Sequence, residues 1–147
     1  MVTTAEPAQR RIAQALVRLA HAVQQVFSEV SREHELTPQQ AQLLCLLIDG
    51  PVGMTGLSRA LHLERSSLSG LVDRAERRGL VARARDSRDR RACRIELTGE
   101  GARVAALAHD AVTARLETLT AGLPPEHHDL LAATLDDLLS RPAPPGP

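Results

Sequence analysis

The chain has 147 residues and no formal net charge, a length that suits one compact domain over residues 1–147. Phe27 is the only Phe, Tyr or Trp, which excludes the stacked aromatic platforms that bind single-stranded nucleic acid. Two cysteines without C-x-x-C spacing, Cys45 and Cys93, exclude a disulfide scaffold and indicate a reducing compartment. Because the N-terminus lacks an apolar signal core, we expect a cytoplasmic protein.

Residues 9–34 are predicted to form an amphipathic helix. Apolar side chains recur in steps of three and four, which is the spacing of one helix face. Such a stripe suits packing against another helix, and it is equally compatible with a helix of a second subunit and with one of the same chain. Its members are Ile12, Leu16, Leu19, Val23, Val26 and Val30.

A second helix is expected to begin at Thr37. Thr37 is the predicted N-cap, Pro38 takes the first helical position, and Gln40 completes a capping box. Residues 41–48 are nearly all apolar, so this helix should be buried on most sides. Residues 49–51, Asp-Gly-Pro, are expected to end it.

Two short helices joined by a tight turn are predicted next. Thr55 is the expected cap of a helix over residues 56–61, and residues 62–64 form the turn. Ser66 or a neighbour caps the second helix, which stops before Gly79. This pattern is typical of a helix-turn-helix. The inward positions are expected to be Leu57, Ala60, Leu61, Leu68, Leu71, Val72 and Ala75.

Residues 80–85 and 92–97 are predicted to pair as a hairpin with a polar tip. In the second arm Cys93, Ile95 and Leu97 alternate with polar or small residues, as in a half-buried strand. Residues 51–98 contain eleven arginines and six acidic residues, so the rest of the chain carries the opposite excess. A concentrated positive charge is typical of a nucleic-acid surface, and a basic hairpin suits a narrow minor groove.

Residues 99–140 are expected to form two further helices. Thr98 begins the first, a break at residues 122–125 separates them, and the second ends near Ser140. The tail, residues 141–147, contains four prolines and is expected to be disordered. The apolar face of the last helix is predicted to hold Leu130, Leu131, Leu135 and Leu138.

Three stretches resemble the MarR (multiple antibiotic resistance regulator) family. They are residues 36–40, the run SSLSGLVDRAERRGLV over residues 66–81, and the wing motif formed by Asp89, Arg91 and Leu97-Thr98. The resemblance covers essentially the whole chain. It implies a mainly α fold, with a winged helix-turn-helix over 35–98 that has a two-stranded β-wing, and dimerisation helices at 9–34 and 99–140. It also implies a homodimer on a pseudo-palindromic operator with half-sites about ten base pairs apart.

The resemblance further implies which side chains contact DNA. Asp89 would orient the wing arginines, and Arg91 would enter the minor groove. The alternatives are a solvated charged face for the arginines and simple helix capping for the two serine hydroxyls at the helix start. Gly70 departs from the family, in which a larger polar residue is common, so one base contact is expected to be missing. The implied DNA-contacting residues are Arg65, Ser66, Ser67, Ser69, Arg74, Arg90 and Arg91.

Many family members release DNA when a small aromatic or phenolic acid binds between the dimerisation helices and the DNA-binding lobe. A ligand can do this only if it binds one arrangement of the two regions better than the other. Each implied residue fits a plain surface position equally well. The implied effector-binding residues are Arg10, Arg11, His21 and His109.

No catalytic, metal or cofactor site is expected. The six histidines lack ligand spacing, and the chain has no nucleophile elbow, P-loop or dinucleotide fingerprint. Cys45 and Cys93 are expected to be inert small hydrophobic residues. The expected function is therefore that of a regulator of transcription that binds double-stranded DNA, a ligand-responsive repressor rather than an enzyme. The alternatives are a winged-helix module that binds another protein and, less favoured, an enzyme.

Overall fold

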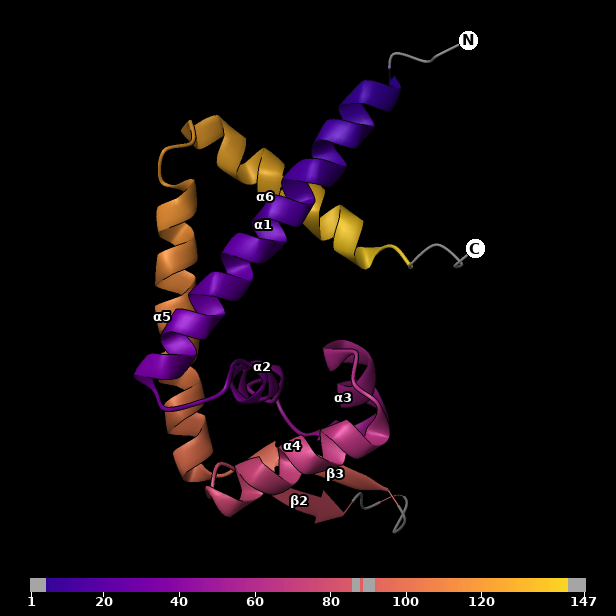
Figure 1. The fold of residues 1–147 in the computed structure, drawn as a ribbon, viewed down its shortest axis with the longest axis vertical. Helices are drawn as coiled ribbons and strands as arrows, with labels where there is room; N and C mark the ends of the chain where they lie inside the picture. Colours follow the sequence, from indigo (N-terminus) through magenta and orange to yellow (C-terminus); the bar gives the residue numbers. More distant parts are fainter. Residues whose placement is uncertain (1–4, 86–87, 89–91, 143–147) are drawn as a thin grey trace. The chain divides into compact units, whose positions relative to one another are not determined.

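The computed structural model of the chain describes residues 5–85, 88 and 92–142 (Figure 1). The chain divides into two compact units, Met1–Thr113 and Ala114–Pro147. Among the described residues, no helix is long and apolar enough to cross a membrane. The elements are α1 (Ala5–Glu33), α2 (Pro38–Leu46), β1 (Val52–Gly53), α3 (Met54–Leu61), α4 (Arg65–Arg77), β2 (Val81–Arg85), β3 (Cys93–Leu97), α5 (Gly99–Thr120) and α6 (Pro125–Ser140).

The capping box at the start of α2 is confirmed. The Oγ1 of Thr37 accepts a hydrogen bond from the Gln40 amide at 3.1 Å, and the Thr37 amide donates to Oε1 of Gln40 at 3.0 Å. Pro38 takes the first helical position, where its missing N–H has no intrahelical partner to lose. Leu43 and Leu44 are fully buried, so α2 is the central helix that its composition predicts.

The hydrophobic core of the first unit is built from α2, α3, α4, the sheet and the start of α5. The inward stripe predicted for α4 is confirmed, because all four of its members are buried. Leucine supplies most of the core volume, which suits a chain that contains a single Phe and no Tyr or Trp. The core residues are Leu36, Ala41, Leu43, Leu44, Leu47, Leu57, Leu68, Leu71, Val72, Ala75, Leu80, Val81, Ile95 and Ala105.

The predicted hairpin is present as β2 and β3, which pair antiparallel from Val81 opposite Leu97 to Arg85 opposite Cys93. A third strand, β1, pairs with the other side of β3 and completes a sheet of order β1-β3-β2. Sequence analysis did not predict β1, because a strand of two residues has no alternation to detect. The strand matters because it ties the start of α3 to the wing.

The prediction for the start of α3 is wrong. The helix begins at Met54 rather than Gly56, and its N-cap is Gly53, with no side-chain cap from Thr55 or any other residue. The reason is the pairing of β1 with β3, which holds Gly53 in the extended conformation and starts the helix directly after the strand. Ala60, expected to face inward, is exposed, whereas Leu57 is buried as predicted.

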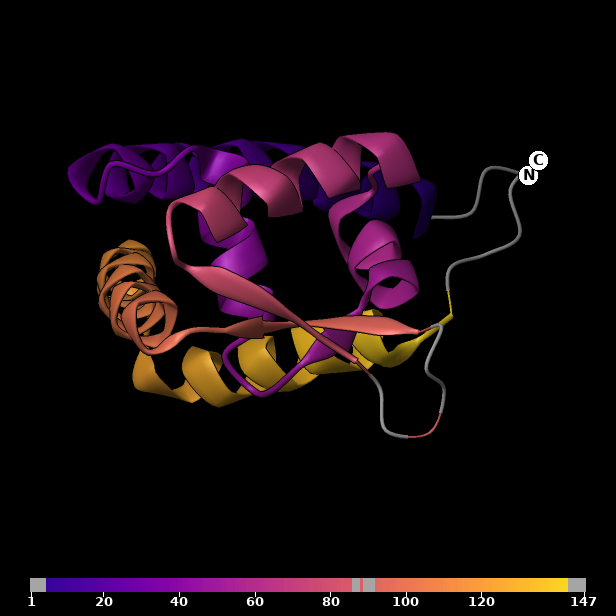
Figure 2. The same ribbon diagram turned by 90° about the horizontal axis from the view of Figure 1, so that it is seen from below.

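The turn between α3 and α4 lies where it was predicted. His62 ends α3 in the left-handed conformation, with φ 52°, and α4 begins at Arg65 with Glu64 as its N-cap. Ser66 is therefore not the cap; it lies within the first turn of α4. In the view of Figure 2, α4 and the β2–β3 hairpin lie on the same side of the first unit, nearest the viewer.

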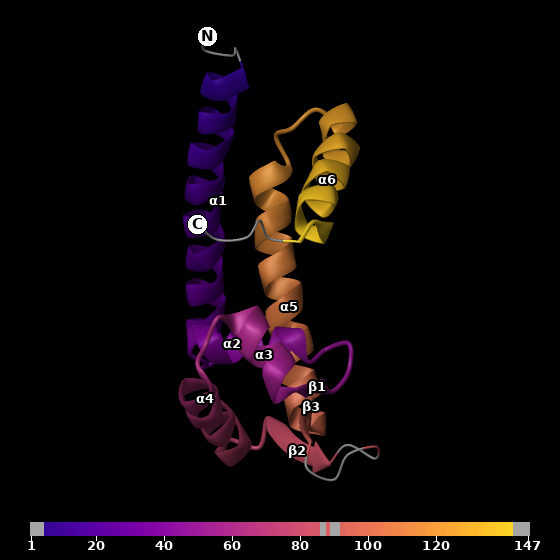
Figure 3. The same ribbon diagram turned by 90° about the vertical axis from the view of Figure 1, so that its right-hand side faces the viewer.

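The start of α5 is packed closely against the turn that precedes β2. Thr98 Oγ1 accepts from the Gly101 amide at 3.0 Å and donates to the Gly79 carbonyl oxygen. A Cβ atom on Gly101 would lie 1.8 Å from the Leu80 carbonyl oxygen, so only glycine fits at this position. Figure 3 shows α5 beginning next to the sheet, directly after β3.

The second unit consists of the end of α5 and α6. The helix α6 begins after Pro124 and ends at Ser140, as predicted. The His128 ring nitrogen Nε2 lies 3.1 Å from the Thr120 carbonyl oxygen and so links the two helices of this unit. None of the α6 residues is buried in the chain, and the predicted apolar face is therefore left largely uncovered.

Candidate nucleic-acid interface

The exposed face of α4 is mostly polar and charged. Helix α4 buries four apolar residues on one side, so the opposite line of its surface runs through Ser66, Gly70, Asp73 and Arg77, in steps of four, three and four. Arg77 lies on this outward line and is exposed. Sequence analysis counted Arg77 only among the eleven arginines of residues 51–98, although its helical spacing from Ser66 and Gly70 could have placed it on this surface.

The residues that sequence analysis assigned to α4 take different positions on this surface. Arg65, Ser66, Ser67 and Arg74 are exposed, whereas Ser69 is half-buried. Gly70 leaves open space that the Arg74 side chain partly occupies, because a Cβ on Gly70 would lie 3.3 Å from Nη1 of Arg74. A side chain at Gly70 would therefore require the Arg74 guanidinium to shift by a few tenths of an ångström.

The wing carries exposed arginines on both of its strands and near its tip. Arg85 ends β2 and is exposed, as is Arg88. Arg94 on β3 is exposed, and its Nη2 donates to the Pro51 carbonyl oxygen at 2.8 Å. The predicted contact residues Arg90 and Arg91, and the orienting residue Asp89, lie outside the described residues. Their roles stay predictions.

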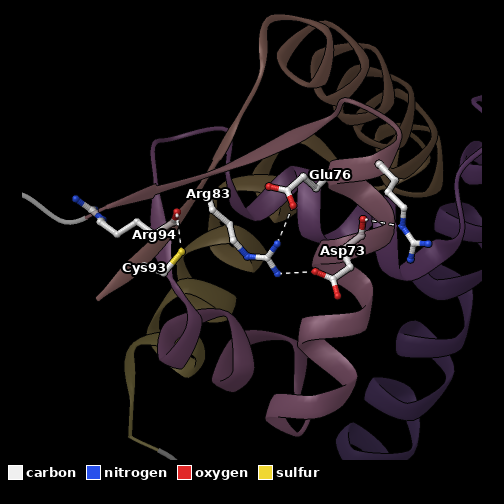
Figure 4. A network of polar contacts seen from close by, with 6 residues as sticks. Asp73, Glu76, Arg83, Cys93 and Arg94 are labelled. Carbon is white, nitrogen blue, oxygen red and sulfur yellow. Dashed lines mark hydrogen bonds and ion pairs between the residues drawn. The ribbon is translucent and has the colours of Figure 1, made fainter. Parts of the chain in front are cut away.

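A network of ion pairs joins the wing to α4. Arg83 of β2 donates from Nη2 to Oδ1 of Asp73 at 2.7 Å and from Nη1 to Oε1 of Glu76 at 2.8 Å (Figure 4). The hydrogen bond to Asp73 is the largest cause that raises the pKa of Arg83, which stays charged. Sequence analysis missed this network, because the pairing depends on which side of β2 faces α4.

The four predicted effector residues are all exposed, on α1 and α5. Arg11 lines an open hollow of about 510 Å³ along α1, together with Ile12, Gln14 and Arg18. Arg10, His21 and His109 are exposed like Arg11 but do not line this hollow. The assignment of all four residues to an effector site therefore stays a prediction.

The two cysteines lie in different surroundings. Cys45 is half-buried in α2, and burial raises the pKa of its thiol, which disfavours the reactive thiolate. Cys93 is half-buried in β3, beside Arg94 (Figure 4). Both are free thiols. In the part of the chain that is described, no three His, Cys, Asp or Glu side chains gather as metal ligands.

Similarity to known proteins identifies the family of this chain. Residues 34–92, which include α2, α3, α4 and β2, match the MarR family. The chain is also 32% identical over 109 residues to the uncharacterised helix-turn-helix transcriptional regulator YsmB of Bacillus subtilis, a match that covers 74% of this chain and 73% of YsmB. This chain belongs to the MarR family.

Further MarR-like proteins support the assignment. The homoprotocatechuate degradative operon repressor of Escherichia coli is 34% identical over 88 residues, and the match spans 59% of this chain and 60% of that repressor. CouR of Rhodococcus jostii, solved with p-coumaroyl-CoA bound, has a TM-score of 0.77 and 28% identity over 89% of this chain and 93% of CouR. The MarR family consists of transcription regulators with a winged-helix fold, and β2–β3 corresponds to the wing of that fold.

Proposed function

We propose that this chain is a cytoplasmic regulator of transcription that binds double-stranded DNA as a homodimer and represses the genes it controls. The main support is the exposed surface of α4, whose hydroxyls and arginines lie beside an arginine-rich hairpin in a chain of the MarR family. A helix of this kind enters the major groove, and a basic wing follows the adjacent minor groove. No catalytic chemistry is part of the proposal.

Two groups of contacts are proposed on this surface. Arg65, Ser66, Ser67 and Arg74 are exposed on α4 and are assigned to base edges and phosphates. Ser69 is half-buried and can contribute only at the edge of this contact. On the wing, Arg91 is assigned to the minor groove, Arg90 to phosphate and Asp89 to orienting them.

DNA binding of the wild-type protein should weaken steeply as salt rises, because arginines that neutralise phosphates release counterions. We expect Arg74→Ala to lower affinity for operator and random duplexes alike, by about tenfold. Arg91→Ala should instead remove most of the preference for operator, a loss of about tenfold or more. Fluorescence anisotropy at several salt concentrations, with an operator selected from fragmented genomic DNA, measures both effects.

Arg32→Ala is the matched control, because Arg32 is exposed at the end of α1 and lies outside the positively charged segment. It should leave both affinities within about twofold of the wild type. If the protein binds no genomic duplex, or if salt leaves its DNA affinity unchanged, the proposed function is refuted. Either result would favour a winged helix that binds another protein.

The homodimer is proposed from apolar side chains that are exposed on two helices, α1 of the first unit and α6 of the second. Ile12, Leu16 and Leu19, from the predicted stripe of α1, are exposed, Ile12 by 57%. On α6, Leu130 and Leu138 are exposed as well. Exposed apolar patches of this kind are typical of interfaces, and the MarR family resemblance implies that a second copy covers them.

We expect sedimentation equilibrium at micromolar concentration to show a dimer, and Ile12→Asp with Leu16→Asp to shift it to monomer. Each buried carboxylate would weaken the interface by several kcal/mol, which is roughly a hundredfold or more in the dissociation constant. Gln24→Asp, on an exposed polar position of the same helix, is the control. A wild-type monomer, or a double variant that remains fully dimeric, would contradict the assignment of α1 to the interface.

A small aromatic or phenolic acid is proposed as the effector. The support is the structure of NadR, 27% identical to this chain, which was solved with the phenolic acid 4-hydroxyphenylacetate. Arg10, Arg11, His21 and His109 are the proposed contacts. Of the four proposed residues, Arg11 also lines the open hollow along α1. Repeating the DNA titration with a series of phenolic acids tests this proposal. If no compound changes the affinity for operator, the proposed effector class is refuted.

A further inference from the structure

The outward surface of α4 contains charges of both signs. The helix carries three arginines, Arg65, Arg74 and Arg77, and two carboxylates, Asp73 and Glu76. Asp73 lies on the outward line of the helix, and both carboxylates are exposed. Left unpaired, they would cancel most of the positive charge of the helix and would repel DNA phosphates.

Both carboxylates are bound by one arginine of the wing. The two terminal nitrogens of Arg83 each take one carboxylate, at 2.7 and 2.8 Å, and the Arg83 side chain is 34% exposed. The Asp73 carbonyl oxygen also accepts a hydrogen bond from Nε of Arg77. Figure 4 shows the Arg83 guanidinium between the two carboxylates, so its charge is directed at α4.

The position of Arg83 in the sheet gives this network a second consequence. Arg83 lies in the middle of β2, opposite Ile95 of β3, and Ile95 is fully buried. The arginine therefore extends from a strand that is anchored in the core. Its planar guanidinium, bonded to two residues one helical turn apart, restrains the orientation of the wing relative to α4.

We propose that Arg83 is a positioning residue for DNA recognition: it neutralises Asp73 and Glu76 on the recognition helix and holds the wing in register with that helix. The proposal rests on the DNA-binding function proposed above. Arg83 is not assigned a phosphate of its own, because its guanidinium is directed at the two carboxylates of α4, with one hydrogen bond from each terminal nitrogen.

The test compares Arg83→Gln with the triple variant Asp73→Asn, Glu76→Gln, Arg83→Gln, in operator and random duplexes across a salt series. Arg83→Gln uncovers the two carboxylates and releases the wing, so affinity for random duplex should fall about fivefold and affinity for operator should fall by more than that. The triple variant removes the carboxylates as well. Its affinity for random duplex should return to the wild-type value or above, while its preference for operator stays reduced because the wing is no longer held.

Two further variants control for charge and for the side chain's shape. Arg141→Gln removes one arginine from the Arg141–Asp137 ion pair in the second unit, and should change neither affinity. Arg83→Lys keeps the charge but cannot bind both carboxylates with a planar fork, so its operator preference should lie between those of the wild type and Arg83→Gln. Thermal melting should place all variants within about 3 °C of the wild type, because exposed ion pairs stabilise little.

A direct phosphate contact by Arg83 makes the opposite prediction. The triple variant would then still bind random duplex more weakly than the wild type, and in both variants the negative slope of log affinity against log salt would become shallower by about 0.9. That result, or an Arg83→Gln variant with wild-type binding, overturns the positioning role. Absence of salt-sensitive binding by the wild-type protein is a separate result, which refutes the DNA-binding function itself.

Discussion

Gly101→Ala is expected to destabilise the protein by roughly 3 kcal/mol, because the new methyl group would lie 1.8 Å from the Leu80 carbonyl oxygen. Both atoms belong to or are fixed by backbone, so no side-chain rotation relieves the overlap. The start of α5 must move away from the turn before β2, which breaks the bonds of Thr98 to Gly79 and Gly101. Urea denaturation followed by helical circular dichroism measures the loss.

Gly99→Ala is the matched control, because Gly99 lies in the same turn of α5 and an added Cβ there meets nothing within 4 Å. Alanine also restricts the unfolded chain more than glycine does. We expect Gly99→Ala to be neutral or to stabilise the protein by about 0.5 kcal/mol. Equal urea midpoints for the two variants, at the same protein concentration, would show that the close approach of α5 to Leu80 is not required.

Leu44→Ala is expected to destabilise the protein by about 3 kcal/mol. Leu44 has no exposed surface and lies in the core between α2 and its neighbours, so alanine removes buried methyl groups and leaves a cavity. The helix α2 is short and is surrounded by other elements, which limits how far the core can collapse into that space. The same urea titration measures the change.

Leu46→Ala provides the comparison within the same helix. Leu46 is 38% exposed, so its replacement removes fewer contacts and opens no closed cavity. The expected loss is below about 1 kcal/mol. A Leu44→Ala variant that is no less stable than Leu46→Ala would contradict the central position of α2 in the core. Because both variants shorten a leucine to alanine, the difference between them reports burial alone.

The elements that sequence analysis predicted well are those whose signals are local. The capping box of Thr37 and Gln40 depends on residues three apart, and both of its hydrogen bonds are present. The alternation of Cys93, Ile95 and Leu97 predicted β3, in which Ile95 is buried. The inner stripe of α4 and the end of α6 followed from helical spacing and from the residues that stop a helix.

The wrong or missing predictions concern contacts between segments distant in sequence. Thr55 has the chemistry of a helix cap, yet α3 begins earlier because β1 pairs with a strand some forty residues away. Arg83, Asp73 and Glu76 were each counted as charges, but only the packing of β2 beside α4 makes them one network. A side chain at Gly101 would clash with the Leu80 backbone, and this clash likewise arises only because α5 packs against Leu80 in the folded chain.

The order of the helices, the hairpin, the positively charged residues 51–98 and the resemblance to the MarR family could be predicted from the sequence, because capping, periodicity and motif spacing act within a few residues of the chain. The folded chain adds that β1 sets the start of α3 and that Arg83 pairs with the two carboxylates of α4. It also leaves the stripe of α1 exposed near Ile12 and Leu16. These features depend on which surfaces meet after folding, and a linear pattern does not contain that information.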